Sequence, residues 1–265
     1  MNVVLFDSAD ERPGGLVALG GDRARHVSSV LRAVPGDPIR LGRSGGPLHL
    51  SGRVVSVSPS GGVLVEPGPP SPPPPRAGAD LLLALPRPKC LKRLWPQLAA
   101  LGPARVFVTA AEKVEKSYWG CTWLREEERG ALMREGLAQA GDTVAPAVSA
   151  VRRLKPFLED VVPSLYAPGK RFFAHPPERG ADSPAGGGVA GFAAAADPAD
   201  PALVAVGPEG GWSPFEIEML ERLGFRRVSL GPRILRTDTA VVALLSIASA
   251  AFRASVRPEN EEPLP

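Results

Sequence analysis

Short apolar runs alternate with Gly- and Pro-containing turns in the first 66 residues of the chain. Runs of this length and spacing are typical of β-strands in a small barrel. One stretch between them has its apolar positions at helical spacing. We therefore expect strands at residues 2–6, 38–42, 49–57 and 62–66, and one helix at about residues 22–32.

From residue 79 onwards, apolar runs alternate with longer segments of helical periodicity. This alternation is typical of βαβ units and predicts a mostly parallel α/β sheet. Pro96 lies inside the first of these helices, where it should kink the helix or mark its true start. The expected strands cover residues 80–85, 105–109, 171–174, 203–206 and 226–230, and the expected helices cover residues 91–101, 124–139, 214–223 and 238–254.

Two segments of unusual composition punctuate the chain. Residues 67–76 consist mostly of Pro, which favours an extended polyproline II spacer. Residues 179–201 are rich in Gly and Ala, and we interpret them as a flexible surface insertion without function. The predicted division is a β-barrel domain at residues 1–66, a Pro-rich linker at residues 67–78 and an α/β domain at residues 79–257.

Composition narrows the class of protein. Gly (29) and Pro (31) are abundant, but hydrophobic residues make up 44% of the chain, which indicates a globular protein. The net charge of +3 does not by itself identify a nucleic-acid partner. Two Cys and three His without metal-ligand spacing argue against a disulfide framework or a metal site. With neither a signal peptide nor a run long enough to span a membrane, we expect a soluble, cytoplasmic protein.

The most informative motif is a glycine-rich loop after a predicted buried strand. Gly-Pro-Glu-Gly-Gly at residues 207–211 directly follows the strand at residues 203–206. Ser213 as N-cap and Glu216 then complete a capping box for the next helix. Such a loop at the carboxyl end of a strand lets a ligand approach the backbone, although a plain strand–helix turn is the alternative. The loop matches neither the GxGxxG nor the Walker A pattern.

A second glycine loop follows the next predicted strand. Gly231-Pro232 turns the chain, and a long helix begins at residues 237–239 with its free N–H groups facing the same region. Arg236 precedes this helix. It could face an anionic or polarised substrate, or it could form a salt bridge to Asp238 or Glu209. The two loops form one pocket only if their strands are near neighbours in the sheet.

The two loops together resemble those of a known family. GPEGGWSPFEIEML (residues 207–220) and LGPRILRTDTA (residues 230–240) resemble the RsmE family of small-subunit rRNA uridine-N3 methyltransferases, which belong to the SPOUT class. Asp238 stands where Glu is usual in that family. Further matches to family patterns lie at residues 26–37, 114–119 and 139–143. The resemblance covers nearly the whole chain in the right order.

This resemblance implies a fold and a cofactor. The fold would be α/β, with an N-terminal PUA-like β-barrel that binds RNA and a C-terminal SPOUT domain whose deep trefoil knot binds S-adenosylmethionine. It also implies a homodimer, because the terminal helix of SPOUT proteins commonly packs across a dimer interface. Burial of the apolar helix at residues 237–252 within the monomer is the alternative. The implied cofactor-binding residues are Phe173, Ala174, His175, Val206, Gly207, Pro208, Glu209, Gly210, Gly211, Leu230, Gly231, Ile234, Leu235 and Thr239.

The candidate catalytic residues are Arg236, Glu209 and Asp238. Methylation at uridine N3 requires loss of an imide proton, so positioning should be combined with proton acceptance and charge stabilisation. A carboxylate could accept the proton, and Arg236 could stabilise the developing charge on O2 or O4. Glu209 could instead bind backbone N–H groups of its own loop.

RNA binding requires cations at a surface. A basic run at residues 87–93 could contact phosphates or could simply form a solvated helix face. Lys116 lies beside Tyr118 and Trp119, whose rings could stack on a base or belong to the core. The predicted RNA-binding residues are Arg23, Arg25, Arg32, Arg87, Lys89, Lys92 and Lys116.

The function expected from these features is S-adenosylmethionine-dependent methylation of uridine N3 in 16S rRNA. The expected partner is 16S rRNA or the small ribosomal subunit, without a membrane or a metal. One alternative is a SPOUT methyltransferase that acts on another RNA, such as tRNA or 23S rRNA. Another is a non-catalytic RNA-binding factor in ribosome assembly. A dehydrogenase and a serine hydrolase are disfavoured because the GxGxxG and GxSxG motifs are missing.

Overall fold

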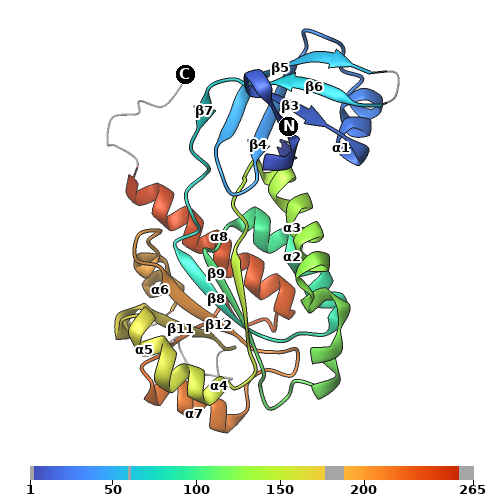
Figure 1. Cartoon of the computed structure of the whole chain (residues 1–265). Helices are drawn as coiled ribbons and strands as arrows, with labels where there is room; N and C mark the ends of the chain where they lie inside the picture. The colour runs from blue at the N-terminus through green and yellow to red at the C-terminus, as the bar shows by residue number, and fades with distance from the viewer. Residues whose placement is uncertain (1–2, 59–60, 177–187, 257–265) are drawn as a thin grey trace. The chain divides into compact units, whose positions relative to one another are not determined.

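The computed structural model describes residues 3–58, 61–176 and 188–256 (Figure 1). The expected strand start at Asn2, residues 179–187 of the expected insertion and residue 257 lie outside the described residues. Contacts divide the chain into two compact units. The first contains residues up to Pro74 together with Ala131–Ala145, and the second contains Pro75–Gly130 and the residues from Pro146 onwards.

The first unit is built on a seven-stranded sheet with the order β1-β4-β5-β6-β3-β2 and with β7 paired to β5. Strands β1 and β4 run parallel, and the other neighbours pair antiparallel. The strands are β1 (Val4–Phe6), β2 (Glu11–Arg12), β3 (Leu16–Leu19), β4 (Pro38–Arg43), β5 (Leu48–Val57), β6 (Val63–Glu66) and β7 (Pro70–Ser71). The short strands β2, β3 and β7 were not predicted, and β7 lies within the expected Pro-rich linker.

Alternate residues of these strands form the core of the first unit, as the period-two pattern predicts. Val17 of β3, Leu41 of β4 and Val65 of β6 are almost fully buried. Helix α1 (Gly21–Arg25) and the π-helical turn η3 (His26–Val30) add Ala24 and Val27 to the same cluster. Short 3₁₀ turns η1 (Ser8–Asp10) and η2 (Pro13–Gly15) connect the first strands.

Residues 131–145 belong to the first unit, whereas the sequence placed them in the α/β domain. The amide of Val3 donates to the carbonyl of Ala138 (2.9 Å), and the amide of Gly45 donates to the carbonyl of Thr143 (2.8 Å). Thr143 also approaches Gly42 so closely that a Cβ at residue 42 would lie 2.6 Å from its methyl group. Backbone pairing and close packing, neither visible in local patterns, hold this segment in the unit.

The second unit contains a six-stranded parallel sheet with the order β10-β9-β8-β12-β11-β13. This confirms the predicted parallel α/β sheet. Its strands are β8 (Ala79–Ala84), β9 (Arg105–Thr109), β10 (Ala147–Val151), β11 (Arg171–Ala174), β12 (Ala202–Val206) and β13 (Arg226–Val228). Its helices are α2 (Pro88–Leu101), α3 (Glu126–Ala140, shared with the first unit), α4 (Leu154–Pro156), α5 (Val162–Leu165), α6 (Val189–Ala195), α7 (Pro214–Arg222) and α8 (Thr237–Val256). Single helical turns lie at η4 (Lys116–Gly120), η5 (Thr122–Leu124), η6 (Phe157–Val161) and η7 (Pro168–Lys170).

Helices cover both faces of this sheet. Alternate side chains of the central strand β8 pack with α4, α5 and α7 on one face, where Leu82 and Phe173 lie in the same cluster as Leu220. Helices α2 and α8 pack against each other, and α8 also contacts β8 and β12. Each fully buried Leu or Phe side chain contributes about 1.5–3 kcal/mol relative to an exposed one.

Two predictions about this unit are corrected, and three of its elements were missed. Pro96 does not mark the start of its helix, because α2 begins at Pro88 and continues through Pro96 to Leu101. The segment 188–201 is not a surface insertion, because it forms α6 and buries Phe192 fully against Phe172. Strand β10 and helices α4 and α5 were not predicted at all. In the described parts of the chain, every helix is too short or too polar to cross a membrane.

Candidate functional site

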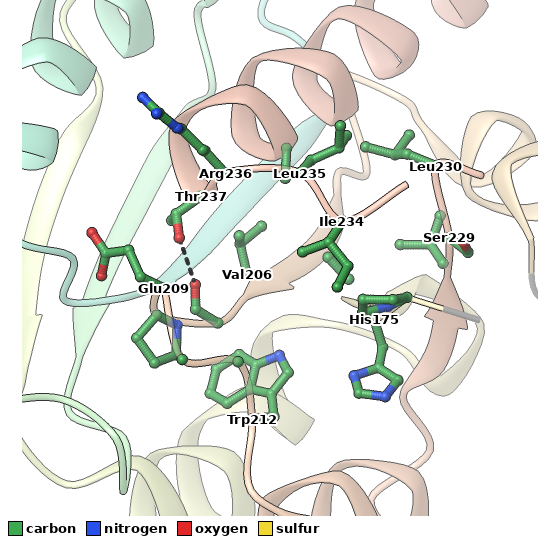
Figure 2. A pocket seen from close by; sticks show the side chains of 18 of the residues that line it. His175, Val206, Glu209, Trp212, Ser229, Leu230, Ile234, Leu235, Arg236 and Thr237 are labelled. Atoms are coloured by element: carbon green, nitrogen blue, oxygen red, sulfur yellow. Dashed lines mark hydrogen bonds between the residues drawn. The ribbon is translucent and has the colours of Figure 1, made fainter. Parts of the chain in front are cut away.

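The two glycine loops and the end of β11 line one pocket of about 560 Å³ at the carboxyl ends of the strands (Figure 2). Strand β11 lies between β12 and β13, so both glycine loops flank the same strand. The sequence left open whether the strands before the two loops are near neighbours in the sheet, and the strand order shows that they are. In open α/β sheets this edge is the usual ligand position.

Most residues predicted to bind the cofactor line this pocket. Phe173 is an exception, because it is fully buried in the sheet, and Thr239 is another, because it lies exposed on α8 outside the lining. The predicted residues in the lining are Ala174, His175, Val206, Gly207, Pro208, Glu209, Gly210, Gly211, Leu230, Gly231, Ile234 and Leu235.

Sequence reasoning missed several lining residues. Trp212 and Ser229 adjoin the predicted motifs, so extending each motif by one position would have found them. Lys113 also lines the pocket, but it follows β9 and had no local signal for this position. Only the strand order brings it there.

The first loop has the backbone that its glycines permit. Gly211 has a left-handed φ of +69°, and its amide donates to the carbonyl of Pro208 (2.8 Å) in a tight turn. A Cβ at Gly207 would lie 3.3 Å from the amide and indole of Trp212. The predicted capping box is present: Ser213 Oγ accepts from the Glu216 amide (3.4 Å), and Glu216 Oε2 accepts from the Ser213 amide (2.8 Å).

The second loop connects to the first through the start of α8. Gly231 has a left-handed φ of +105°, which lets the chain turn back after β13. Thr237, the first residue of α8, is buried, and its Oγ1 donates to the carbonyl of Gly207 (3.4 Å; Figure 2). The amino end of a 20-residue helix, with its positive dipole end, therefore lies against the glycine loop.

Neither alternative salt bridge of Arg236 is present. Asp238 instead pairs with Arg93 of α2 (Nη2–Oδ2 2.6 Å), and Glu209 Oε1 accepts from the backbone amide of Arg87 (3.0 Å). Glu209 thus binds a backbone N–H group, but one from the β8–α2 connection rather than from its own loop. Arg236 is exposed, and its side chain makes no hydrogen bond or ion pair within the described structure. Its guanidinium is free for a ligand.

The pocket lining combines charged side chains with apolar ones. Figure 2 shows Glu209 and Arg236 on one side and His175 and Ile234 on the other. The side chain of Ile234 is 86% exposed, which is unusual for a residue of this size and apolarity. The pocket can therefore offer apolar surface to one part of a ligand and charge to another.

Asp238 lies outside the pocket lining, and its contacts join the start of α8 to α2. Besides pairing with Arg93, its Oδ1 accepts from the amide of Thr239 (3.1 Å). The hydrogen bond from Arg93 lowers the pKa of Asp238. Burial, followed by the charges of Asp238 and Glu209, raises the pKa of the nearby Cys90 thiol to about 11. Cys90 is therefore neutral at physiological pH and a poor nucleophile.

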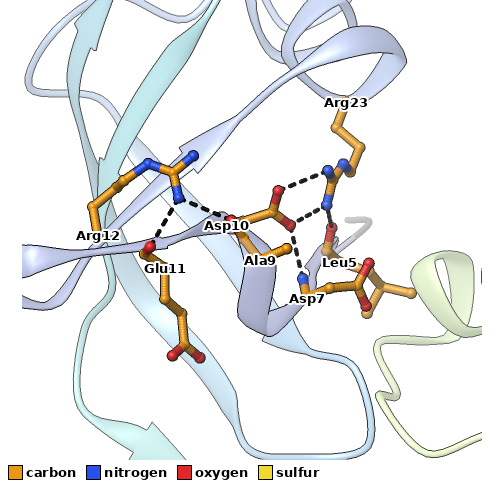
Figure 3. Close-up of polar contacts among 7 residues, drawn as sticks. All are labelled: Leu5, Asp7, Ala9, Asp10, Glu11, Arg12 and Arg23. Carbon is orange, nitrogen blue, oxygen red and sulfur yellow. Dashed lines mark hydrogen bonds and ion pairs between the residues drawn. The ribbon is translucent and has the colours of Figure 1, made fainter.

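The predicted RNA-binding residues of the first unit differ in whether their side chains are already paired within the protein. Arg23 forms a two-pronged ion pair with Asp10 (2.5 and 2.9 Å), and its Nη1 also donates to the carbonyl of Leu5 (3.3 Å; Figure 3). Arg25 pairs with Asp22 on the surface (2.9 Å). Arg32 is exposed and makes no hydrogen bond or ion pair within the described structure.

In the second unit the basic run lies at the start of α2. Arg87 and Lys89 are exposed, whereas the ammonium of Lys92 lies 4.3 Å from the ring centre of Trp123. Lys116 is exposed in η4. Trp119, in the same turn, is half-buried with the guanidinium of Arg152 at 4.9 Å from its ring centre. Among the described residues, His, Cys, Asp and Glu form no group of three that could hold a metal ion.

Comparison with known proteins identifies the family. Residues 73–249, more than half of the chain, match the model of an RNA methyltransferase domain. Ribosomal RNA small subunit methyltransferase E of Treponema pallidum (strain Nichols) is 26% identical over 171 residues, which are 64% of this chain and 61% of that relative. The protein of the same name from Aquifex aeolicus (strain VF5) is 54% identical over 44 residues, 17% of this chain and 19% of that relative. The chain thus spans less than two thirds of the length of these relatives.

A solved structure agrees with the family match. The fold is similar to that of a ribosomal RNA small subunit methyltransferase E from Neisseria gonorrhoeae bound to S-adenosyl methionine, with a TM-score of 0.66 and 20% identity. The similarity covers 94% of this chain and 98% of that one. The chain belongs to the family of proteins with the RNA methyltransferase domain. The names of the curated relatives confirm its resemblance to the RsmE family.

Proposed function

We propose that this protein transfers a methyl group from S-adenosylmethionine to N3 of a uridine in 16S rRNA. The observation that carries the proposal is the free guanidinium of Arg236 on the same side of a glycine-loop pocket as the carboxylate of Glu209. Membership of the RNA methyltransferase family and the names of the matched relatives supply the reaction class and the RNA.

The residues of the pocket suit S-adenosylmethionine. Residues 207–211 and 230–235 would hold it with backbone groups, because glycine leaves those groups open to a ligand. The exposed side chain of Ile234 and the neighbouring Leu235 suit a purine ring. When bound, the cofactor supplies a methyl group on a positively charged sulfonium.

Two polar residues of the pocket, Glu209 and Arg236, would take part in the transfer. Glu209 would accept the N3 proton, the N3–methyl bond would form as the sulfur–methyl bond breaks, and Arg236 would stabilise negative charge on a uracil oxygen. Asp238, which forms an ion pair with Arg93, would position the start of α8 and would not accept the proton.

The remaining features of the proposal concern the whole chain. We propose that the first unit is a PUA-like barrel that binds RNA through Arg32, and that α2 adds phosphate contacts through Arg87 and Lys89. The return of residues 229–236 from the edge strand β13 to α8, which packs on β8 and β12, supports a trefoil knot. We further propose a homodimer in the cytoplasm, and the partly exposed apolar side chains Val242 and Ile247 of α8 support the dimer.

The reaction can be tested directly. Incubation with labelled S-adenosylmethionine and small subunits that lack the modification should give N3-methyluridine, identified by mass spectrometry of the digested RNA. Transfer to tRNA, to 23S rRNA or to another base would favour the first alternative function. Cofactor binding without transfer to any RNA would favour the non-catalytic assembly factor.

Arg236→Ala should reduce the transfer rate by about 10²–10³-fold, because it removes a charge that acts on the transition state. Affinity for S-adenosylmethionine should change little, as measured by calorimetric titration. Arg222→Ala, which removes an exposed arginine at the end of α7, is the matched control and should retain activity. Full activity in Arg236→Ala would remove this residue from the catalytic set.

A further inference from the structure

A loop from a more distant strand supports the first glycine loop. Residues 110–115 leave β9 at its carboxyl end and reach the loop that follows β12, although β8 lies between these two strands. The backbone amide of Glu112 donates to Glu216 Oε1 (2.8 Å), while the other oxygen of Glu216 caps α7. Lys113 then extends over the glycine loop itself.

Lys113 contacts the glycine loop with both its ammonium and its stem. The ammonium donates to the carbonyl of Gly210 (2.9 Å) and to that of Trp212 (3.4 Å). The stem lies along Gly210: a Cβ at that residue would be 3.1 Å from Cδ and 3.3 Å from Cβ of Lys113. This contact accounts for a glycine at residue 210, whose φ is not in the left-handed region.

This double contact has more effect on the loop's shape than on the stability of the fold. Lys113 is an exposed residue, so water can reach the two carbonyls in a variant that lacks its ammonium. The loop contains three glycines, and fixing the backbone of each residue costs roughly 1–2 kcal/mol of entropy. A loop that is already ordered binds its ligand more tightly, because less entropy is lost on binding.

We propose that Lys113 is a positioning residue that holds the glycine loop in its cofactor-binding shape and thereby sets the affinity for S-adenosylmethionine. The inference rests on the proposed function, since it takes this pocket as the cofactor site. Lys113 acts through the backbone of residues 210–212, and it exchanges no proton with the substrate.

Calorimetric titration of the full chain with S-adenosylmethionine tests this role without RNA. Lys113→Met keeps most of the stem and removes the charge, and it should raise the dissociation constant about tenfold, which corresponds to about 1.4 kcal/mol. Lys113→Arg should restore most of the affinity, because a guanidinium can also donate to two carbonyls. Lys155→Met, at an exposed lysine of α4 that pairs with Glu159, is the matched control and should bind as the wild type does.

Turnover and melting temperature separate positioning from other roles. At saturating S-adenosylmethionine, the kcat of Lys113→Met should stay within about twofold of wild type, and its melting temperature should fall by no more than a few degrees. A large fall in kcat at saturation would overturn the proposal, and so would an unchanged dissociation constant. A wild-type protein that fails to bind S-adenosylmethionine would overturn both this proposal and the proposed function. Binding without transfer to RNA would overturn only the latter.

A double-mutant cycle tests the contact with Gly210 specifically. Gly210→Ala should weaken binding in the wild-type chain, because the new methyl group meets the Lys113 stem. In a Lys113→Ala chain, which lacks that stem, the same change should have a smaller effect, so the two changes should not be additive. Additive effects would contradict the proposed contact between Lys113 and the loop.

Discussion

Arg32 has a left-handed backbone, with φ at +52°, at the point where the first helical segment ends. Glycine is the usual residue in such a position, and a side chain there costs about 1–2 kcal/mol. Val30 and Leu31, which precede Arg32 in the chain, are exposed apolar residues. A strained residue with a free charge on an exposed surface is consistent with selection for binding rather than for stability.

Replacing Arg32 separates these two effects. Arg32→Gly should increase the free energy of unfolding by about 1 kcal/mol and weaken binding to 16S rRNA, with a salt-dependence slope reduced by about one. Arg32→Ala should weaken binding equally without the gain in stability, because the strained backbone stays. Denaturant titration and RNA titration at several salt concentrations measure the two quantities. Wild-type RNA affinity in both variants would exclude Arg32 from the RNA-binding surface.

The ion pair of Asp10 with Arg23 stabilises the first unit in a pH-dependent way (Figure 3). Burial alone would raise the pKa of Asp10, but the hydrogen bonds from Arg23 and from the Asp7 amide lower it below its ordinary value. The stabilisation is therefore present above the unfolded pKa, near 3.9, and is lost as the pH falls through the lower folded value.

Asp10→Asn should accordingly reduce the free energy of unfolding by about 1 kcal/mol at pH 7, a value limited by the partial exposure of Arg23. The difference from wild type should shrink as the pH falls below the unfolded pKa and disappear below the lower folded pKa, where Asp10 and the substituted Asn are both neutral. Urea titrations across this range measure it. A difference that stays constant with pH would show that the ion pair is not its source.

At the scale of elements, α6 shows how a low-complexity segment can still be structural. Its small residues let the helix approach its neighbours closely, and it contacts α8. Lys170 also holds this segment in place, because its ammonium donates to the carbonyls of Ala195 (3.0 Å) and Asp200 (2.8 Å). Composition alone indicated a loop here because one aromatic residue among many Ala and Gly is a weak signal.

Phe192→Ala should therefore reduce the free energy of unfolding by about 3–5 kcal/mol, the usual effect of removing a fully buried aromatic ring. Val189→Ala, at a half-buried position of the same helix, should have a much smaller effect. Thermal or denaturant unfolding of the two variants compares them directly. Equal stabilities would mean that α6 does not contribute to the core.

For the molecule as a whole, the first unit is discontinuous in sequence. Its sheet comes from the first 74 residues. Its last segment, Ala131–Ala145, follows in the sequence only after residues 75–130, which belong to the second unit. Folding of the first unit is then coupled to the position of α3. Close packing of Thr143 on Gly42 makes this late segment part of the fold rather than an accessory.

A fragment of residues 1–78, cut where composition places the boundary, should therefore melt at a lower temperature than the first unit in the full chain. A peptide of residues 126–145 should bind the fragment and raise its melting temperature. Circular dichroism with and without the peptide measures both effects. The coupling would be refuted if the fragment alone melted at the temperature of the first unit in the full chain and the peptide did not change that temperature.

The sequence by itself determined most helices and strands of the second unit, both glycine loops, the capping box and the family. These features depend on residues two to four positions apart, where backbone geometry leaves a periodic trace. The tertiary structure decided which groups meet. Glu209 lies 122 residues from its partner Arg87, Asp238 lies 145 from Arg93, and Lys113 lies 97 from Gly210. Such pairs depend on the order of strands in the sheet, which no local pattern contains, so only the folded chain shows that Arg236 is free and that Lys113 supports the glycine loop.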